Sequence, residues 1–211
     1  MKVLFYGDSI TDAGRNRASA INSLESLGFG YVRDVASALL GEDPLKYEVI
    51  DRGISGNRIV DLYSRVKCDL WNLEPDVISI LIGVNDVWHE VAYQNGVEID
   101  RFEKVYRMLI EDTLKVLPNV KIIIMEPFVL KGSATEEKYD EFLAVKDYAK
   151  VCKKLAEEFN LPFLPLQDKF DEHAEKFGVK PCLSDGVHPN IHGARVIADE
   201  WLNLFKKKIL G

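Results

Sequence analysis

Short apolar runs alternate with longer amphipathic stretches along the whole chain. Five runs are predicted to be buried strands because they are short and rich in β-forming residues, and they cover residues 3–6, 47–50, 77–82, 120–125 and 162–166. Between them, apolar residues recur at helical spacing over residues 31–40, 59–70, 102–117, 142–159, 168–177 and 194–205. Gly41 is expected to end the first of these helices. Strands that alternate with helices predict a parallel sheet covered by helices on both faces.

Composition and charge narrow the classes of function. The 211 residues fit one domain, predicted to span residues 1–211, and 47% hydrophobic with 29% charged residues is typical of a globular protein. The net charge of −7 argues against a basic surface that would bind nucleic acid. No stretch of the sequence approaches the roughly 20 consecutive apolar residues that a membrane span requires. The three cysteines lack metal-binding spacing, and the apolar run before Gly7 is too short for a signal peptide. We therefore expect reduced thiols and a cytoplasmic location.

Polar clusters follow the predicted strands. Ser9 comes just after the first strand, Gly53 lies in the loop after the second, and Asn85 follows the third. Asp185 and His188 share the last loop, before the final helix. Because the carboxyl ends of parallel strands meet at one edge of a sheet, we expect these side chains to share one crevice.

The Asp185-x-x-His188 pair supplies what a serine nucleophile needs. A residue three positions along a tight turn can face back to the first, so the Asp185 carboxylate is expected to accept a hydrogen bond from His188 Nδ1. That bond fixes the tautomer in which Nε2 takes the proton of Ser9, which is a weak nucleophile without a base. The alternative for the pair is a helix-initiating turn with a satisfied histidine.

Acyl transfer also requires donors for an oxyanion. The predicted donors are the backbone N–H of Ser9, the backbone N–H of Gly53 and the side-chain amide of Asn85. The alternative is that Gly53 serves only a turn and Asn85 only caps one.

Four motifs together resemble a known family. GDSIT at residues 7–11, GISGN at 53–57, GVND at 83–86 and DGVHP at 185–189 are similar, in this order, to the four conserved blocks of the SGNH (GDSL-type) hydrolases. The resemblance implies a three-layer α/β/α flavodoxin-like fold with a central, mostly parallel five-stranded sheet, and ester hydrolysis without metal or cofactor. It implies that Ser9 is the nucleophile, His188 the base and Asp185 its partner, with Ser9, Gly53 and Asn85 as oxyanion donors. Ile10 stands where the family has its name-giving leucine.

A narrower resemblance points to the acetyl xylooligosaccharide esterases. It rests on GDSITD followed by Gly14-Arg15, on the G-x-G-Y-V segment at residues 28–32, on the G-x-NDVW block at 83–88 and on Pro127-Phe128. It implies removal of a short acyl group, most simply acetyl, from a small acylated sugar, and hints at a homo-oligomer.

Three further residues are candidates for contact with substrate: Asp8, Arg15 and Trp88. Trp88 follows Asn85 by three positions, so its ring either stacks on a sugar or packs in the core. Arg15 either contacts a substrate hydroxyl or seals the loop after Ser9, and Asp12 is expected to tie that loop down.

Several other functions compete with this interpretation. His188 and His192 have the spacing of a zinc pair on a helix, but Pro189 intervenes and no third ligand is evident. A metallophosphoesterase would use Asp8, Asn85, Asp86 and His188, yet its opening D-x-H motif is missing. A lysophospholipase or thioesterase of the same family is the nearest alternative, although the polar segment 12–28 offers little sign of an apolar trough. A non-catalytic carbohydrate-binding protein would have no need for an oriented base.

Overall fold

One five-stranded sheet organises the computed structural model, which describes residues 1–211. Its strands are β1 (Lys2–Gly7), β2 (Glu48–Gly53), β3 (Val77–Leu81), β4 (Lys121–Met125) and β5 (Phe163–Leu164). All neighbouring strands run parallel, in the order β2-β1-β3-β4-β5. This order is that of flavodoxin-like sheets, so the predicted fold class is confirmed.

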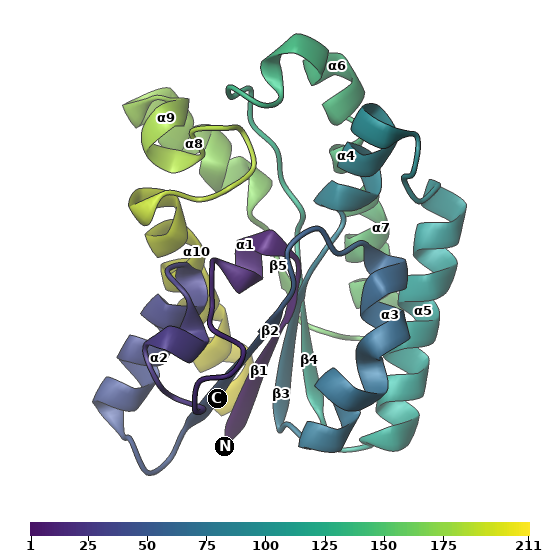
Figure 1. The fold of residues 1–211 in the computed structure, drawn as a ribbon. Helices are drawn as coiled ribbons and strands as arrows, with labels where there is room; N and C mark the ends of the chain where they lie inside the picture. The colour runs from purple at the N-terminus through teal and green to yellow at the C-terminus, as the bar shows by residue number, and fades with distance from the viewer.

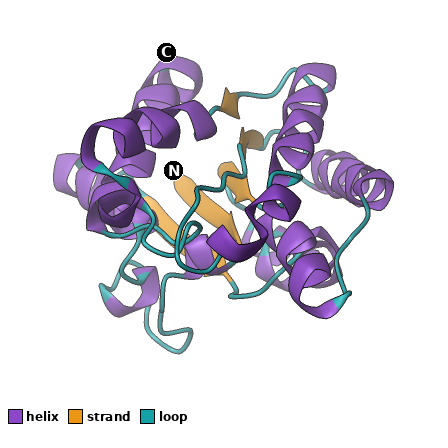
Figure 2. Ribbon diagram, turned by 90° about the horizontal axis from the view of Figure 1, so that it is seen from above, coloured by secondary structure: helices purple, strands orange, loops and turns teal.

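Helices cover both faces of the sheet (Figures 1 and 2). The helices α2 (Tyr31–Glu42), α8 (Gln167–Phe177) and α10 (Ile191–Phe205) form one layer, and α3 (Ile59–Asp69), α5 (Ile99–Val116) and α7 (Val145–Glu158) form the other. The shorter helices are α1 (Ser9–Asp12), α4 (Val84–Tyr93), α6 (Tyr139–Phe142) and α9 (Val179–Cys182), and a π-helical turn, Lys206–Leu210, follows α10. The result is the three-layer arrangement that alternating strands and helices require.

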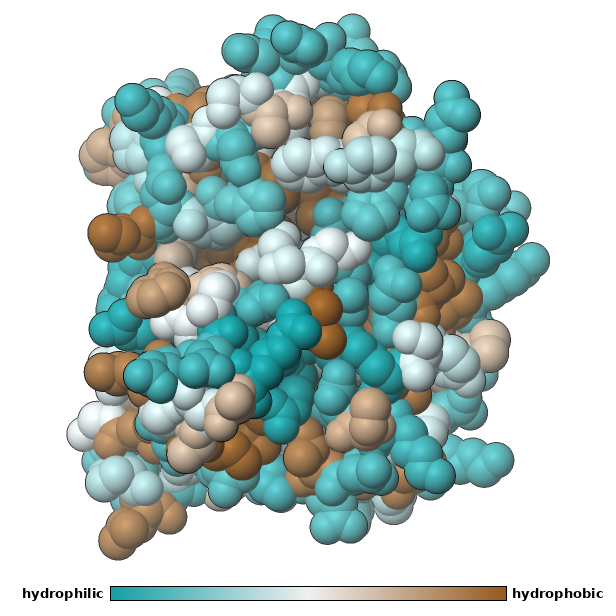
Figure 3. Space-filling model, viewed as in Figure 1, coloured by the Kyte–Doolittle hydropathy of each residue, from teal (hydrophilic) through white to brown (hydrophobic).

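The central strands are apolar because both of their faces are covered. The side chains of Val3, Leu4, Phe5 and Tyr6 are fully buried, and all five residues of β3 are buried. Ser79 is the one polar residue of β3, and its hydroxyl accepts a hydrogen bond from Trp201 Nε1 at 2.8 Å. A single cluster of 57 buried hydrophobic residues runs from β1 to the chain's last turn. On the molecular surface seen in Figure 3, hydrophilic side chains predominate, with apolar ones scattered among them.

The sheet has a crevice at the carboxyl end of β1. The chain passes from β1 to β2 through α2 in one layer, and from β2 to β3 through α3 in the other. The chain leaves the carboxyl end of β1 toward α2 on one face, and leaves the neighbouring strand β3 toward α5 on the other face, so the two adjacent strands part at this edge. Ligands of open α/β sheets bind at such a switch point. None of the helices combines the length and apolar character needed to cross a lipid bilayer.

Several predicted boundaries are wrong. Helix α2 continues through Gly41 to Glu42, because that glycine lies at an exposed position and nothing forces the helix to end there. Strand β2 extends to Gly53, which pairs with Gly7 of β1, so Gly53 ends a strand and does not lie in the loop where it was predicted. Helix α4 was not predicted at all. The predicted helix over residues 142–159 corresponds to α7, which begins at Val145, because Phe142 ends the separate helix α6.

Candidate active site

Ser9 opens the one-turn helix α1 directly after β1. The turn is set by Asp8, whose Oδ1 accepts a hydrogen bond from the backbone N–H of Ile10 at 2.9 Å and caps the helix. A residue in the first turn of a helix has no partner for its N–H within the helix. The nucleophile candidate therefore presents both its hydroxyl and its backbone N–H at the crevice.

The structure brings Ser9, His188 and Asp185 into one hydrogen-bonded chain. Ser9 Oγ lies 2.8 Å from His188 Nε2, although the two residues are 179 positions apart. His188 Nδ1 lies 2.6 Å from Asp185 Oδ2, so Nδ1 carries the donated proton when Nε2 accepts from Ser9. Asp185 Oδ1 also accepts from the backbone N–H groups of Val187 at 2.9 Å and His188 at 2.7 Å. The same carboxylate thus folds the loop and orients the imidazole.

Electrostatics favour an ionised Asp185 beside a basic His188. Burial alone would raise the pKa of Asp185, but hydrogen bonds from His188 Nδ1 and from the two backbone N–H groups lower it to about 2. The hydrogen bond to Asp185 raises the pKa of His188, against the opposing effect of burial. His188 therefore binds a proton more readily than an isolated histidine does, as a general base for a hydroxyl requires.

Asn85 lies in the first turn of α4, at the carboxyl end of β3. Its Nδ2 donates to the backbone carbonyl of Asn57 at 3.1 Å, which fixes the orientation of the amide. An amide nitrogen carries two hydrogens, so one is left for a ligand. Asn85 is 7% exposed and lines the same cavity as Ser9.

Gly53 is not placed to act as an oxyanion donor, and that prediction is wrong. Its N–H already donates to Asp51 Oδ1 at 2.7 Å, and the residue is buried. A side chain at Gly53 would collide with the backbone of Thr11 and Asp12 in α1. The glycine is needed because β2 passes so close to the helix that carries Ser9.

Gly56 is the residue that sequence reasoning missed. It lines the cavity together with Ser9 and Asn85, and its N–H makes no hydrogen bond within the protein. Its φ of +81° is the left-handed conformation that favours glycine. The signal was present in the GISGN motif, whose second glycine lies beyond the end of β2.

Two cavities flank the Ser9–His188 pair. One, of about 260 Å³, is lined by Ser9, Ser55, Gly56, Asn85, Trp88, His89, Tyr93 and His188. The other, of about 210 Å³, is lined by Ser9, Ile10, Ala13, Phe29, Gly30, His188 and Pro189.

Three aromatic residues of α4, Trp88, His89 and Tyr93, form one wall of the first cavity. Trp88 packs edge-on against Phe142 at 5.5 Å between ring centroids, and lies 6.0 Å from the ring of His188. His89 is half-buried in this wall.

The three predicted substrate contacts lie in different surroundings. Trp88 lines the cavity beside Ser9, whereas Asp8 is fully buried and Arg15 is 9% exposed. Arg15 Nε donates to the carbonyl of Gly53 at 2.9 Å and lies 3.5 Å from Asp51 Oδ1, so Arg15 seals the loop from within. Asp8 holds the turn under Ser9, and burial raises its pKa to about 7.

Asp12 ties its loop to the GISGN motif, as predicted. Asp12 Oδ2 accepts hydrogen bonds from Ser55 N at 2.9 Å and Ser55 Oγ at 3.0 Å.

The residues considered as metal ligands are engaged elsewhere. His192 Nε2 lies 2.9 Å from His173 Nδ1, while His188 points to Ser9 and Asp185. Asp86 is fully buried and accepts the N–H of Ile59 at 3.0 Å. No three histidine, cysteine or carboxylate side chains cluster as a metal ion requires.

Comparison with known proteins identifies the family. The chain matches the GDSL-like lipase/acylhydrolase family over residues 5–196. It is 37% identical over 207 residues to an acetylxylan esterase of Geobacillus stearothermophilus, with 95% of this chain and 92% of that protein covered. A crystal structure of that esterase superposes with a TM-score of 0.85, at 34% identity and with 96% and 93% of the two chains covered. A candidate GDSL-like lipase from Parabacteroides merdae gives a TM-score of 0.91, at 39% identity and with 98% and 96% covered. The chain therefore belongs to the GDSL-like lipase/acylhydrolase family and is a carboxylic ester hydrolase.

Proposed function

We propose that this protein is a serine esterase that removes acetyl groups from xylo-oligosaccharides or related sugars through an acyl-enzyme. The observation that carries the proposal is the hydrogen-bonded chain from Ser9 Oγ through His188 to Asp185, with distances of 2.8 and 2.6 Å. It opens on a cavity that also presents Gly56 and Asn85. Nucleophile, base and oxyanion donors are thus within reach of one ester carbonyl.

The proposed reaction has two halves. His188 Nε2 takes the proton of Ser9 while Oγ attacks the carbonyl carbon, and the oxyanion forms against the N–H groups of Ser9 and Gly56 and the Asn85 amide. The C–O bond to the sugar breaks, and the sugar oxygen leaves with the proton from His188. Water then gives a proton to the same nitrogen and attacks the carbonyl carbon of the acyl-serine. The bond between that carbon and Ser9 Oγ breaks, His188 returns the proton to Oγ, and the carboxylic acid is released and ionises in water.

Relatives support an acetylated sugar as the substrate. The related Geobacillus esterase is described as acting on acetylxylan and acetyl-xylooligosaccharides. Its catalytic mutants replace a serine, an aspartate and a histidine, the last two being three positions apart, as Asp185 and His188 are. In this chain the cavity beside Ser9 has an aromatic wall from Trp88 and Tyr93, and such faces stack on sugar rings. A homo-oligomeric state and a cytoplasmic location are further parts of this proposal. A cytoplasmic location would suit an enzyme that acts on short oligosaccharides taken up by the cell.

Replacement of Ser9 tests the mechanism. Ser9→Ala should lose nearly all hydrolysis of 4-nitrophenyl acetate and of acetylated xylo-oligosaccharides, because nucleophile and base act as a unit. Thr11→Ser, close by in α1, is the control for disturbance of the turn. Position-resolved NMR of the sugar products would identify the hydroxyl that is released. Turnover retained by Ser9→Ala would overturn the proposal.

A longer acyl chain is the second candidate, because one observation favours it. The cavity of about 210 Å³ has an apolar lining, and Phe29 at its edge is 78% exposed. The loop after Ser9 therefore offers more apolar surface than its polar sequence predicted. A comparison of acetyl and octanoyl 4-nitrophenyl esters decides between the two: faster octanoyl turnover would support a lipase or thioesterase.

A further inference from the structure

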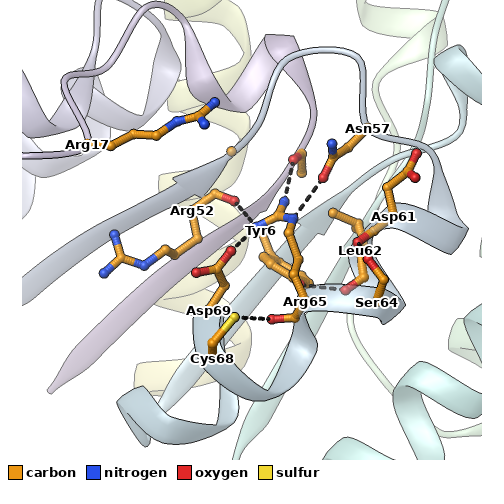
Figure 4. Close-up of polar contacts among 12 residues, drawn as sticks. Tyr6, Arg17, Arg52, Asn57, Asp61, Leu62, Ser64, Arg65, Cys68 and Asp69 are labelled. Carbon is orange, nitrogen blue, oxygen red and sulfur yellow. Dashed lines mark hydrogen bonds and ion pairs between the residues drawn. The ribbon is translucent and has the colours of Figure 1, made fainter.

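Arg65, in the second turn of α3, reaches from the helix layer to the carboxyl edge of the sheet (Figure 4). Its side chain is 12% exposed, and four hydrogen bonds hold the guanidinium. Nε donates to Asn57 Oδ1 at 2.7 Å, one terminal nitrogen donates to the carbonyl of Arg52 at 2.9 Å, and the other donates to the carbonyl of Gly7 at 3.1 Å. Asp69 Oδ2 accepts the fourth at 2.9 Å. Arg65 makes no hydrogen bond to Ser9, His188 or Asp185.

The acceptors of Arg65 come from the segments that carry the reacting groups. Gly7 ends β1, two residues before Ser9, and Arg52 precedes Gly53 in β2. Asn57 follows Gly56 in the loop. One cation therefore sets the spacing between the end of the nucleophile strand and the loop that presents the Gly56 N–H.

Asn57 passes this constraint on to the second oxyanion donor. Its side-chain oxygen accepts from Arg65, while its backbone carbonyl accepts from Asn85 Nδ2 at 3.1 Å. The result is a continuous chain from Arg65 through Asn57 to Asn85. A shift of Asn57 would change the direction of the Asn85 amide as well as the position of Gly56.

The guanidinium is itself clamped. The ring of Tyr6 lies under it, 4.4 Å from the guanidinium carbon to the ring centroid, and the Tyr6 hydroxyl donates to the carbonyl of Leu62 at 2.6 Å (Figure 4). A planar group with fixed donor directions satisfies several acceptors at once, and a lysine ammonium lacks that geometry. The site therefore requires an arginine rather than a positive charge alone.

We propose that Arg65 is a positioning residue for the oxyanion hole: it holds Gly56 and, through Asn57, Asn85 at the distances from Ser9 that the reaction requires. This inference rests on the proposed function, because it assigns no new reaction. Arg65 does not touch the substrate, so its effect is expected in the chemical step and not in binding. Donors displaced by even a fraction of an ångström lose much of their effect on an oxyanion.

The experiment compares Arg65→Lys with Arg107→Lys in the intact 211-residue chain. Arg107 also combines an ion pair, with Glu158 at 2.6 Å, and a ring contact, with Phe159 at 5.7 Å, but it lies on α5 away from the loop. For 4-nitrophenyl acetate, Arg65→Lys should lower kcat by about 10- to 100-fold with KM changed by less than about threefold, and Arg107→Lys should stay within about twofold of the parent. The rate of Ser9 phosphorylation by an organophosphate should fall in parallel with kcat.

A double-mutant cycle separates positioning from general damage. Asn57→Ala removes the acceptor of Arg65 Nε, so Arg65→Lys should have a much smaller effect in that background than in the parent. Fully multiplicative effects, a change confined to KM, or a loss equal to that of Arg107→Lys would overturn the inference while leaving the esterase intact. Absence of Ser9-dependent hydrolysis in the unaltered protein would overturn the proposed function first.

Discussion

Two loops meet at Ser9, and they are held in different ways. In the loop with Asp185 and His188 the histidine is oriented from within, because the Asp185 carboxylate accepts hydrogen bonds from groups two and three positions along the chain. Backbone N–H groups of Leu130, Ser133 and Ala134 hold this loop against the segment after β4. The loop over residues 54–58 is held from outside by side chains of α1 and α3. Asp12 accepts hydrogen bonds from Ser55, and Arg65 donates one to Asn57. The orientation of His188 is thus set by a neighbour three positions away, whereas the position of Gly56 depends on contacts with α1 and α3.

Asp185→Asn should give the largest effect and tests the local contact between Asp185 and His188. The amide oxygen can still accept the backbone N–H groups of Val187 and His188, so the turn should survive. The amide nitrogen would face His188 Nδ1 and favour the tautomer with a proton on Nε2, which cannot accept from Ser9. By analogy with serine proteases, kcat should fall by about 10⁴-fold.

The measurement is kcat on 4-nitrophenyl acetate, with the circular dichroism spectrum and melting temperature as checks of the fold. Asp168→Asn, at an exposed position of α8, is the matched control and should leave kcat unchanged. A loss of less than about tenfold in Asp185→Asn would mean that the carboxylate serves the loop and not the base.

The two glycines of the GISGN motif test the externally held loop and should give the next largest effects. Gly53→Ala would push a methyl group into the backbone of α1, so we expect severe loss of stability. Gly56→Ala meets no atom within 4 Å, but its φ of +81° costs a side chain about 1–2 kcal/mol. Its melting temperature should fall by several degrees, and its kcat by about tenfold as the donor N–H moves.

For both variants, thermal melting measures the stability, and kcat is normalised to the amount of folded protein. A Gly53→Ala protein that folds normally but loses only kcat would restore Gly53 as the donor. An unchanged kcat in Gly56→Ala would show that the reaction does not depend on the position of the Gly56 N–H.

The same contrast explains what could be predicted from the sequence. All five strands were found within a few residues, because buried parallel strands are short continuous apolar runs. Asp185 and His188 were placed correctly relative to each other because their contact is local. Gly53 and Gly56 were confused because the choice depends on the contact between β2 and α1, which joins residues about forty positions apart. His89 was missed because its surroundings are set by α4, an element that the sequence did not predict.

Asp8→Asn should give the smallest effect on activity. Asp8 lies under Ser9, in neither loop, and the substitution tests the effect of its charge on His188. Burial raises the pKa of Asp8 to about 7 from an ordinary value of 3.8, and the N–H of Ile10 and the nearby charge of His188 oppose the rise. Conversely, ionised Asp8 adds to the Asp185 interaction that raises the pKa of His188. An asparagine can still accept from Ile10, so the turn under Ser9 should remain.

The expected change is therefore in the pH profile. Since His188 must be neutral to act as a base, kcat/KM rises as pH increases through the pKa of His188. Without the negative charge at position 8 that pKa falls, and the acid limb of kcat/KM should move to lower pH by less than about one unit. The folded pKa of Asp8 lies above its unfolded value, so the native state binds the extra proton, and stability falls as pH rises from about 3.8 through about 7. Asp8→Asn should lessen that fall. The pH profiles of the parent and of Asp8→Asn are measured side by side. An acid limb at the same pH in both would show that Asp185 alone, and not Asp8, raises the pKa of His188.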